Sequence, residues 1–233
     1  METGKKEVFA AVVLAAGRGK RMESSVHKQY LLLHEKPVLY YALKAFEESP
    51  VQEIVLVVGK GEIEYCQKEI VEKYGFQKIS YIIEGGAERY HSVYCGLKAI
   101  KGADYVLIHD GARPFITEEI LERGMFGVQE TGACVVGMPS KDTVKVADEA
   151  DFVSETPDRK RVWTVQTPQI FSYDLIRGAY ESIRKKDMTG VTDDAMVVEQ
   201  ETGTKILLVE GSYQNIKITT PEDLAIAEAF LRY

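Results

Sequence analysis

Basic side chains gather in a short glycine-containing segment near the N-terminus. The segment "VLAAGRGKRMESSVHKQY" begins at Val13 as an apolar run and supplies five side chains that can carry positive charge: Arg18, Lys20, Arg21, His27 and Lys28. A strand that leads into such a loop can direct several backbone N–H groups into one concavity, which binds phosphate groups. The segment favours a polyphosphate site; the alternative is a solvated basic loop whose glycines serve only turns.

Two familiar phosphate-binding motifs do not fit this segment. A Walker loop requires Ser or Thr after its lysine, but Arg21 follows Lys20, and Leu14 occupies the position of its first glycine. A dinucleotide-binding fingerprint requires a third glycine where Met22 stands. A phosphate site here must therefore be of another kind.

Two further strand ends carry residues suited to a ligand site. "EGGAERYHS" places Gly86 in a turn and Ser92 near a helix start, which suits nucleotide contacts but also an ordinary strand-to-helix connection. "YVLIHDGARPF" places Asp110 just past a buried strand, where a carboxylate is costly unless it is exposed at a site edge, hydrogen-bonded or near a metal. Arg113 follows in the same loop, so a local salt bridge with Asp110 is the alternative.

The second half of the chain adds basic and hydroxyl side chains. Arg159, Arg161 and Thr167 lie in a segment of β-forming residues, and Lys217 lies in "NIKIT", which we predict to be a strand. Lys217 alternates with two isoleucines and should point away from them. A lysine that faces solvent is the usual explanation of this pattern, and the sequence does not reject it.

Strand-like and helix-like stretches alternate through the first half of the chain. "VFAAVVLAA" precedes "PVLYYALKAFEES", "EIVLVVG" precedes "EIEYCQKEIVEKYG", "KISYIIEGG" precedes "YHSVYCGLKAI", and "DYVLIHDG" precedes "TEEILERGMFGVQETG". Four such units predict a parallel sheet with helices on its faces, and the unbroken apolar runs indicate strands covered on both sides. Ligands bind such sheets beyond the carboxyl ends of the strands, where the motifs above lie.

The alternation of strand-like and helix-like stretches ends after "ACVVGMP". Residues 140–167 have short β-forming pieces, acidic turns and no helical period, so we expect a hairpin or arm inserted into one domain that spans residues 1–233. Helical patterns return in "SYDLIRGAYESIRKK" and "TDDAMVVEQETG", followed by strands in "KILLVEG" and "NIKIT". A final helix should begin with Thr220, Pro221 and Asp223 as cap, first-turn proline and capping-box partner.

Composition restricts the class of protein. The 233 residues carry a formal net charge of −7, which disfavours nucleic acid and anionic membrane surfaces as partners. The N-terminal apolar run is too short to span a bilayer. The cysteines, Cys66, Cys95 and Cys134, form no C-x-x-C pair; they suit a reducing cytoplasm, and we expect them to be small buried side chains.

These motifs and several others occur in one order along the chain: "AAGRGKRM", "HKQY", "GGAERYHSV", "HDGARPF", "KDT", "PDR", "QTPQIF", "TDD" and "NIKITTPEDLAIAE". From about Val8 to the C-terminus, the set resembles the 2-C-methyl-D-erythritol 4-phosphate cytidylyltransferase family. The resemblance implies an α/β fold of the nucleotide-diphospho-sugar-transferase type, with a mostly parallel, doubly wound sheet. It also implies a projecting β-arm, at residues 140–167 here, through which two subunits form a homodimer.

The resemblance implies a reaction in the non-mevalonate pathway to isoprenoid precursors. CTP and 2-C-methyl-D-erythritol 4-phosphate would give 4-diphosphocytidyl-2-C-methyl-D-erythritol and pyrophosphate, with a divalent metal, usually Mg²⁺. The alcohol phosphate attacks the α-phosphorus of CTP, so no protein nucleophile is needed. That agrees with a sequence that shows anion-binding charge and no nucleophile paired with a base.

The resemblance also implies roles for single residues. Arg21 and Lys28 would stabilise charge on the α-phosphate and the leaving pyrophosphate, while Arg159 and Lys217 would orient the attacking phosphate. Contacts with the alcohol phosphate would further come from Thr143, Thr167 and, from the partner subunit, Arg113. The metal would be held mainly by the CTP phosphates, with Asp110 as a candidate ligand. The nucleotide-contacting positions would be Ala15, Ala16, Gly17, Gly19, Gly86, Ser92 and Asp110.

Two departures and three alternatives remain open. Many members have an aspartate where Ala87 stands, which matters only if base recognition uses that carboxylate, and often a proline where His27 stands. A pentitol-phosphate cytidylyltransferase, for example one acting on ribitol 5-phosphate, shares most of the motifs. An NAD-linked oxidoreductase would need the missing third glycine, and a nucleotide-sensing module would not need the cations expected at the acceptor phosphate.

Overall fold

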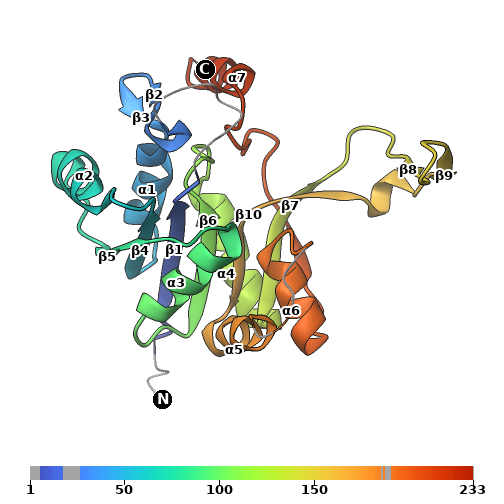
Figure 1. Cartoon of the computed structure of the whole chain (residues 1–233), viewed down its shortest axis with the longest axis horizontal. Helices are drawn as coiled ribbons and strands as arrows, with labels where there is room; N and C mark the ends of the chain where they lie inside the picture. The colour runs from blue at the N-terminus through green and yellow to red at the C-terminus, as the bar shows by residue number, and fades with distance from the viewer. Residues whose placement is uncertain (1–5, 18–26, 185, 187–189, 233) are drawn as a thin grey trace.

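The computed structural model describes residues 6–17, 27–184, 186 and 190–232. Its main element is a seven-stranded sheet with the order β11-β7-β10-β6-β1-β4-β5 (Figure 1). All neighbours in it are parallel except β10, which is antiparallel to both β6 and β7, so the expected mostly parallel sheet is confirmed. The strands are β1 Phe9–Ala15, β4 Glu53–Val58, β5 Ile79–Glu84, β6 Tyr105–Asp110, β7 Ala133–Pro139, β10 Trp163–Ser172 and β11 Leu207–Glu210.

Helices cover both faces of this sheet. One buried cluster joins it to α1, α2 and α4, and a second joins it to α3, α5 and α6. Strand β1 shows why both faces are apolar: Val13 packs into the first cluster and Val12 into the second, as the two-residue period of a strand requires. The helices are α1 Val38–Glu48, α2 Ile63–Cys66 with its π-helical continuation η3 Gln67–Glu72, α3 Arg89–Ala99, α4 Glu118–Thr131, α5 Tyr173–Ile183, α6 Asp194–Thr202 and α7 Pro221–Phe230.

The predicted strand–helix units of the first half are all present, and their strands end at one edge of the sheet. Leu14 is in register with Asp110 of β6, Ala15 with Val58 of β4, and Val58 in turn with Glu84 of β5. The loops that follow these strands therefore meet at the carboxyl edge, which positions any ligand site built from them.

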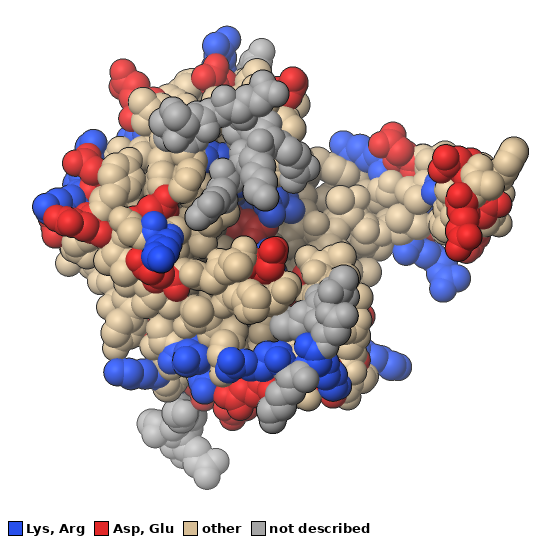
Figure 2. Space-filling view, in the orientation of Figure 1, with Lys and Arg blue, Asp and Glu red and all other residues tan. Residues whose placement is uncertain are grey.

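The segment predicted to be an arm projects away from the sheet (Figure 1). It contains the antiparallel pair β8 Val146–Ala147 and β9 Val153–Glu155 and the short 3-10 helix η4 Arg159–Arg161. Figure 2 shows acidic and basic side chains on the projecting part. The expected end of the arm at residue 167 is too late, because β10 begins at Trp163 and pairs with β7 from there.

The last part of the chain differs from expectation in one element. The "NIKIT" segment forms no strand; it is an extended loop in which the Ile218 N–H donates to the Ala112 carbonyl at 2.8 Å. Its apolar pattern arises because the Ile218 side chain is fully buried against a small cluster that includes Val38 and Ala227. The helix after it begins as predicted at Pro221, with the Thr220 N–H donating to Asp223 Oδ2 at 2.9 Å.

Short elements complete the fold near the carboxyl edge. The 3-10 helix η2 Lys28–Tyr30 leads into a small hairpin of β2 Leu32–Leu33 and β3 Lys36–Pro37, and β2 contacts α7. Within the described residues, none of these helices has both the length and the apolar character needed to span a membrane.

Candidate functional site

A pocket of about 890 Å³ lies at the carboxyl edge of the sheet. Its walls come from the ends of β1, β4 and β6, the glycine loop before α3, the start of η2 and the loop that carries Lys217. The structure thus brings together seven of the predicted site residues: Ala16, Gly17, Lys28, Gly86, Ser92, Asp110 and Lys217. Ala15 lies next to them as the last residue of β1, whereas Gly19 and Arg21 lie outside the described residues.

The glycine loop is held in one conformation by the Ser92 hydroxyl. Its oxygen accepts a hydrogen bond from the Gly86 N–H at 3.1 Å, and its O–H donates one to the Glu88 carbonyl at 3.2 Å. A Cβ atom on Gly85 would lie 2.5 Å from Ser92 Oγ, and one on Gly86 would lie 2.3 Å from the Cβ of His91. The loop therefore requires glycine at both positions for steric reasons, and Ser92 supports the pocket wall through the loop's own backbone.

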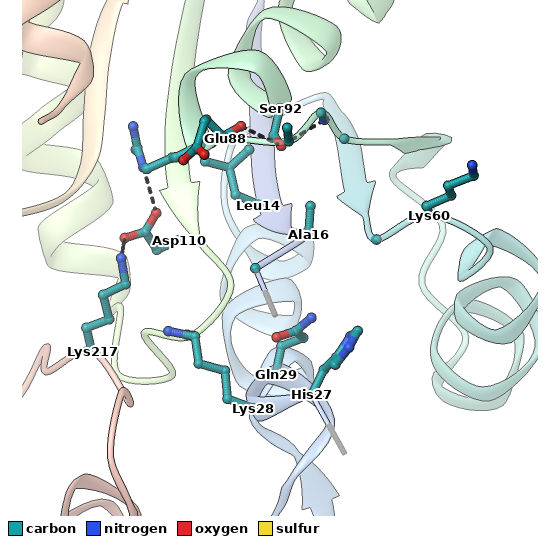
Figure 3. Close-up of a pocket in the computed structure, with 17 residues that line it drawn as sticks. Leu14, Ala16, His27, Lys28, Gln29, Lys60, Glu88, Ser92, Asp110 and Lys217 are labelled. Atoms are coloured by element: carbon teal, nitrogen blue, oxygen red, sulfur yellow. Dashed lines mark hydrogen bonds and ion pairs between the residues drawn. The ribbon is translucent and has the colours of Figure 1, made fainter. Parts of the chain in front are cut away.

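Asp110 lies between two cations. Lys217 Nζ is 2.7 Å from Asp110 Oδ2, and Arg89 Nε is 3.2 Å from Oδ1 (Figure 3). Burial raises the pKa of the Asp110 carboxyl, but Arg89 and then Lys217 outweigh burial and hold that pKa far below its usual range. Both simpler readings of the sequence are wrong: Lys217 is not a plain surface lysine, and the ion pairs of Asp110 among the described residues are not with Arg113.

Arg89 and Asp194 are site residues that sequence reasoning missed. Arg89 opens α3 and lines the pocket, and its guanidinium binds both carboxylate oxygens of Asp194 at 2.9 and 2.7 Å. Asp194 is fully buried at the start of α6 and also accepts from the Tyr180 hydroxyl at 2.6 Å. The motifs "GGAER" and "TDD" contain both residues, but their pairing spans 105 positions and has no local signal.

Thr167 binds the backbone of Asp110 directly, and a buried histidine orients the Thr167 hydroxyl. The Asp110 N–H donates to Thr167 Oγ1 at 3.1 Å, and Thr167 Oγ1 lies 3.1 Å from His109 Nδ1. His109 Nε2 lies 3.2 Å from the Arg113 carbonyl oxygen, so Nε2 carries the proton and Nδ1 accepts from the threonine. Burial lowers the pKa of His109 to about 4, which keeps the ring neutral and this chain of hydrogen bonds intact.

Lys28 is placed by the residue that follows it. Gln29 is buried, and its Nε2 donates to the Ala15 carbonyl oxygen, which fixes η2 beside the end of β1. The Lys28 side chain extends toward the side of the pocket that holds Asp110 and Lys217 (Figure 3). Lys28, Lys217 and Arg89 therefore bring cations to this side of the pocket, and Lys60 lines it as well, an arrangement that can bind a polyanion and stabilise added negative charge.

The remaining predicted residues lie away from the pocket lining. Thr143 and Arg159 are exposed on the arm side, where Arg159 Nη1 donates to the Lys141 carbonyl at 3.0 Å. Arg113 Nη1 donates to the carbonyl of Asn215 in its own chain at 2.7 Å. The structure of one chain brings neither Thr143 nor Arg159 to the pocket wall.

The described residues contain no group of three or more His, Cys, Asp or Glu side chains that could hold a metal ion. Asp110 is a single carboxylate, and both its oxygens face cations. These residues fit a metal that arrives on phosphate oxygens better than one held by the protein alone.

Comparison with known proteins decides the family. Residues 9–233 match the family described as IspD: 2-C-methyl-D-erythritol 4-phosphate cytidylyltransferase. The chain belongs to this family. The cytidylyltransferase of that name from Lachnoclostridium phytofermentans is 54% identical over 226 residues, which cover 97% of each chain. That from Lachnospira eligens is 53% identical over 224 residues, covering 95% of this chain and 98% of the relative.

Solved cytidylyltransferase structures share the fold. The 4-diphosphocytidyl-2C-methyl-D-erythritol synthase of Anaerococcus prevotii superimposes with a TM-score of 0.87 at 36% identity, covering 97% of each chain. The cytidylyltransferase of Thermus thermophilus gives a TM-score of 0.76 at 32% identity, covering 97% of this chain and 100% of that one. The resemblance seen in the sequence and the fold class it implied are therefore both confirmed.

Proposed function

We propose that this chain is a CTP-dependent nucleotidyltransferase that joins CTP and 2-C-methyl-D-erythritol 4-phosphate. The products are 4-diphosphocytidyl-2-C-methyl-D-erythritol and pyrophosphate, a step in isoprenoid precursor synthesis. The observation that carries the proposal is a cationic pocket at the carboxyl edge of the sheet in a chain that matches this family over residues 9–233.

The residue roles are those that the family resemblance implies, and the places of Lys28 and Lys217 in the pocket lining support two of them. The acceptor phosphate attacks the α-phosphorus of CTP and pyrophosphate leaves, so the protein supplies orientation and charge. Lys28, with Arg21, stabilises the charge on the α-phosphate and the leaving group, and Lys217 orients the attacking phosphate. The glycine loop and Ala16 line the end of the pocket suited to a nucleoside.

CTP enters as its magnesium complex in this proposal. Mg²⁺ keeps near-octahedral oxygen coordination and is commonly bound through substrate phosphates plus one or two carboxylates. Two carboxylates, Glu88 and Asp110, line the described part of the pocket, and Asp110, at the end of β6, is the candidate for that role. The expected result is that EDTA abolishes turnover and added Mg²⁺ restores it; turnover that persists in EDTA would refute the requirement.

The exposed apolar side chains of the arm support association with a second subunit. Phe152 and Val153 near its tip are 71% and 59% exposed, which is unusual for apolar side chains unless another surface covers them. We infer a homodimer in which the exposed Arg159 and Thr143 help bind the alcohol phosphate across the interface, in place of Arg113, which is bound to the Asn215 carbonyl of its own chain. Analytical ultracentrifugation of the intact chain tests this, because an active monomer would contradict it.

Subunit mixing tests the shared site. Lys217→Ala and Arg159→Ala would each be poorly active alone, but if the arm of one subunit completes the pocket of the other, a mixed dimer has one intact site. Random exchange should then restore about a quarter of wild-type activity. If each subunit completes its own site, mixing restores nothing.

The deciding experiment measures pyrophosphate release. CTP, UTP and ATP are each combined with 2-C-methyl-D-erythritol 4-phosphate and with ribitol 5-phosphate. We expect turnover with CTP and the methylerythritol compound, and a preference for ribitol 5-phosphate would favour the pentitol branch. The enzyme would work in the cytoplasm, a location that its free thiols, Cys66, Cys95 and Cys134, suit.

A further inference from the structure

Four charged side chains of alternating sign form a continuous chain from the protein interior to the pocket. Asp194 binds Arg89, Arg89 binds Asp110, and Asp110 binds Lys217. The side chain at the inner end, Asp194, is 0% exposed and the side chain at the outer end, Lys217, is 35% exposed, with Arg89 at 28% and Asp110 at 10% between them. The buried end is therefore fixed and the open end faces the ligand.

The buried end is anchored on several sides. Asp194 accepts two bonds from Arg89 and one from Tyr180, and its backbone N–H donates to Gln169 Oε1 at 2.9 Å. A bidentate arginine–carboxylate pair fixes the plane of the guanidinium. Arg89 is thus held so that its Nε points at Asp110.

The open end has one carboxylate serving two cations. Arg89 binds Asp110 Oδ1 and Lys217 binds Oδ2, so neither oxygen is available to the other cation without rotation of the carboxylate. If Arg89 were absent, the carboxylate could turn and bind Lys217 with both oxygens. Lys217 would then sit deeper and give up less readily the hydrogen bonds that an incoming phosphate needs.

We infer that Arg89 is a positioning residue of the transfer reaction: by holding the Asp110 carboxylate it sets the place of Lys217 for the attacking phosphate. The inference rests on the proposed function and adds to it a residue, anchored on α6, that acts through Asp110 and Lys217. Arg89 need not touch the reacting atoms to have this effect.

The test must separate positioning from plain structural support, since Arg89→Gln alone leaves a buried, unpaired Asp194 and can fail to fold. The double variant Arg89→Gln/Asp194→Asn removes both charges; Asn keeps the shape of the Asp194 side chain, and Gln is shorter than Arg89 but stays polar. Its stability should recover to near wild type. Its KM for the alcohol phosphate should stay raised about tenfold, the effect of losing one hydrogen bond to a charged group.

Arg177→Gln is the matched control. Arg177 also binds a carboxylate, Glu181, at 2.6 Å and a tyrosine hydroxyl, Tyr173, at 2.9 Å, but it lies on α5 and not in the pocket lining. Its kinetic constants should equal those of the wild type.

The decisive comparison repeats the double substitution in Lys217→Ala. If Arg89 acts through Lys217, the further rise in KM should shrink to less than about twofold, because interacting residues are not additive. A full tenfold rise there, or normal KM in the double variant, would overturn the inference. Wild-type protein runs in the same assay, and a wild type that releases no pyrophosphate would instead refute the proposed function and the inference with it.

Discussion

The pocket wall and the arm hold their charged side chains in opposite ways. Asp110, Arg89 and Lys217 are mutually bonded and mostly shielded, with side-chain exposures of 10%, 28% and 35%. Arg159 and Thr143 on the arm side are exposed, and Arg159 donates only to the Lys141 backbone among the described contacts of its side chain. One region has its geometry fixed within a single chain, and the other is free to take its geometry from a second surface.

This difference predicts what each region controls. A site with fixed charges loses little entropy when it meets the transition state, so electrostatic stabilisation should come mainly from the pocket wall. A region on an exposed arm gains its order only on association, so it should control access and assembly more than the folding of its own subunit.

The largest expected effect belongs to Lys217. Lys217→Ala removes the ammonium group nearest Asp110 in the pocket, and we expect turnover to fall about a hundredfold or more while the affinity for CTP stays nearly unchanged. Steady-state kinetics and calorimetry measure the two quantities. Lys98→Ala, an exposed lysine on α3 outside the pocket lining, is the control and should behave as wild type. Collapse of CTP binding would contradict the role given to Lys217.

The second effect is on stability and arises inside the pocket wall. His109 has a pKa lowered to about 4 in the folded protein, against about 6.5 when unfolded. The unfolded chain therefore takes up a proton first as the pH falls, so the stability from neutral His109 is complete above about pH 6.5 and is lost between there and about pH 4. The loss should approach roughly 3 kcal/mol.

Urea unfolding at several pH values between 4 and 7.5 tests this, with His109→Asn as the comparison. The variant cannot titrate at that position, so the difference in pH dependence between the two proteins isolates His109 from other groups. Equal slopes in both proteins would show that the ring is not held neutral.

Much of the pocket wall could be predicted, because its residues lie at strand ends that the apolar pattern locates. Asp110 is predictable as a site residue because a carboxylate beside a buried strand is costly. Its partners are not, since Arg89 lies 21 positions away and Lys217 far along the chain. The prediction of a strand at "NIKIT" is wrong. Ile218 is buried, which gives the segment the apolar–polar alternation of a strand, but the segment does not pair with any strand of the sheet.

The boundary between the arm and strand β10 is harder to predict, for a physical reason. Strand β10 contains Gln166, Gln169 and Pro168, residues that rarely indicate a central strand, and it is the antiparallel member of the sheet. Its polar side chains are buried because they bond to other chain segments, as Gln169 does to α6. Only the tertiary partners show that this stretch is part of the sheet and that the arm ends before it.

The third effect tests the glycine loop. Gly86→Ala would place a methyl group 2.3 Å from the His91 Cβ, so the loop must move, and CTP affinity should fall about tenfold. Gly178→Ala is the matched control, because an added methyl there meets no atom within 4 Å and replaces a helical glycine of α5. That change should raise stability by about 0.5–1 kcal/mol and leave CTP binding unchanged. Unaltered calorimetric affinity in Gly86→Ala would show that the loop adapts.

The smallest expected change in stability lies on the arm side and sharpens the contrast with the pocket wall. Arg159 is exposed, so Arg159→Ala should alter the free energy of unfolding by no more than about 0.5 kcal/mol. The same substitution should nevertheless weaken alcohol-phosphate binding, and Arg159→Lys should also do so, because a point charge replaces a planar fork that binds two phosphate oxygens. Denaturation of both variants measures the change in stability, and steady-state kinetics measure the change in alcohol-phosphate binding. A large loss of stability would mean that Arg159 is structural, and unchanged kinetics would mean that it is a surface side chain with no part in the site.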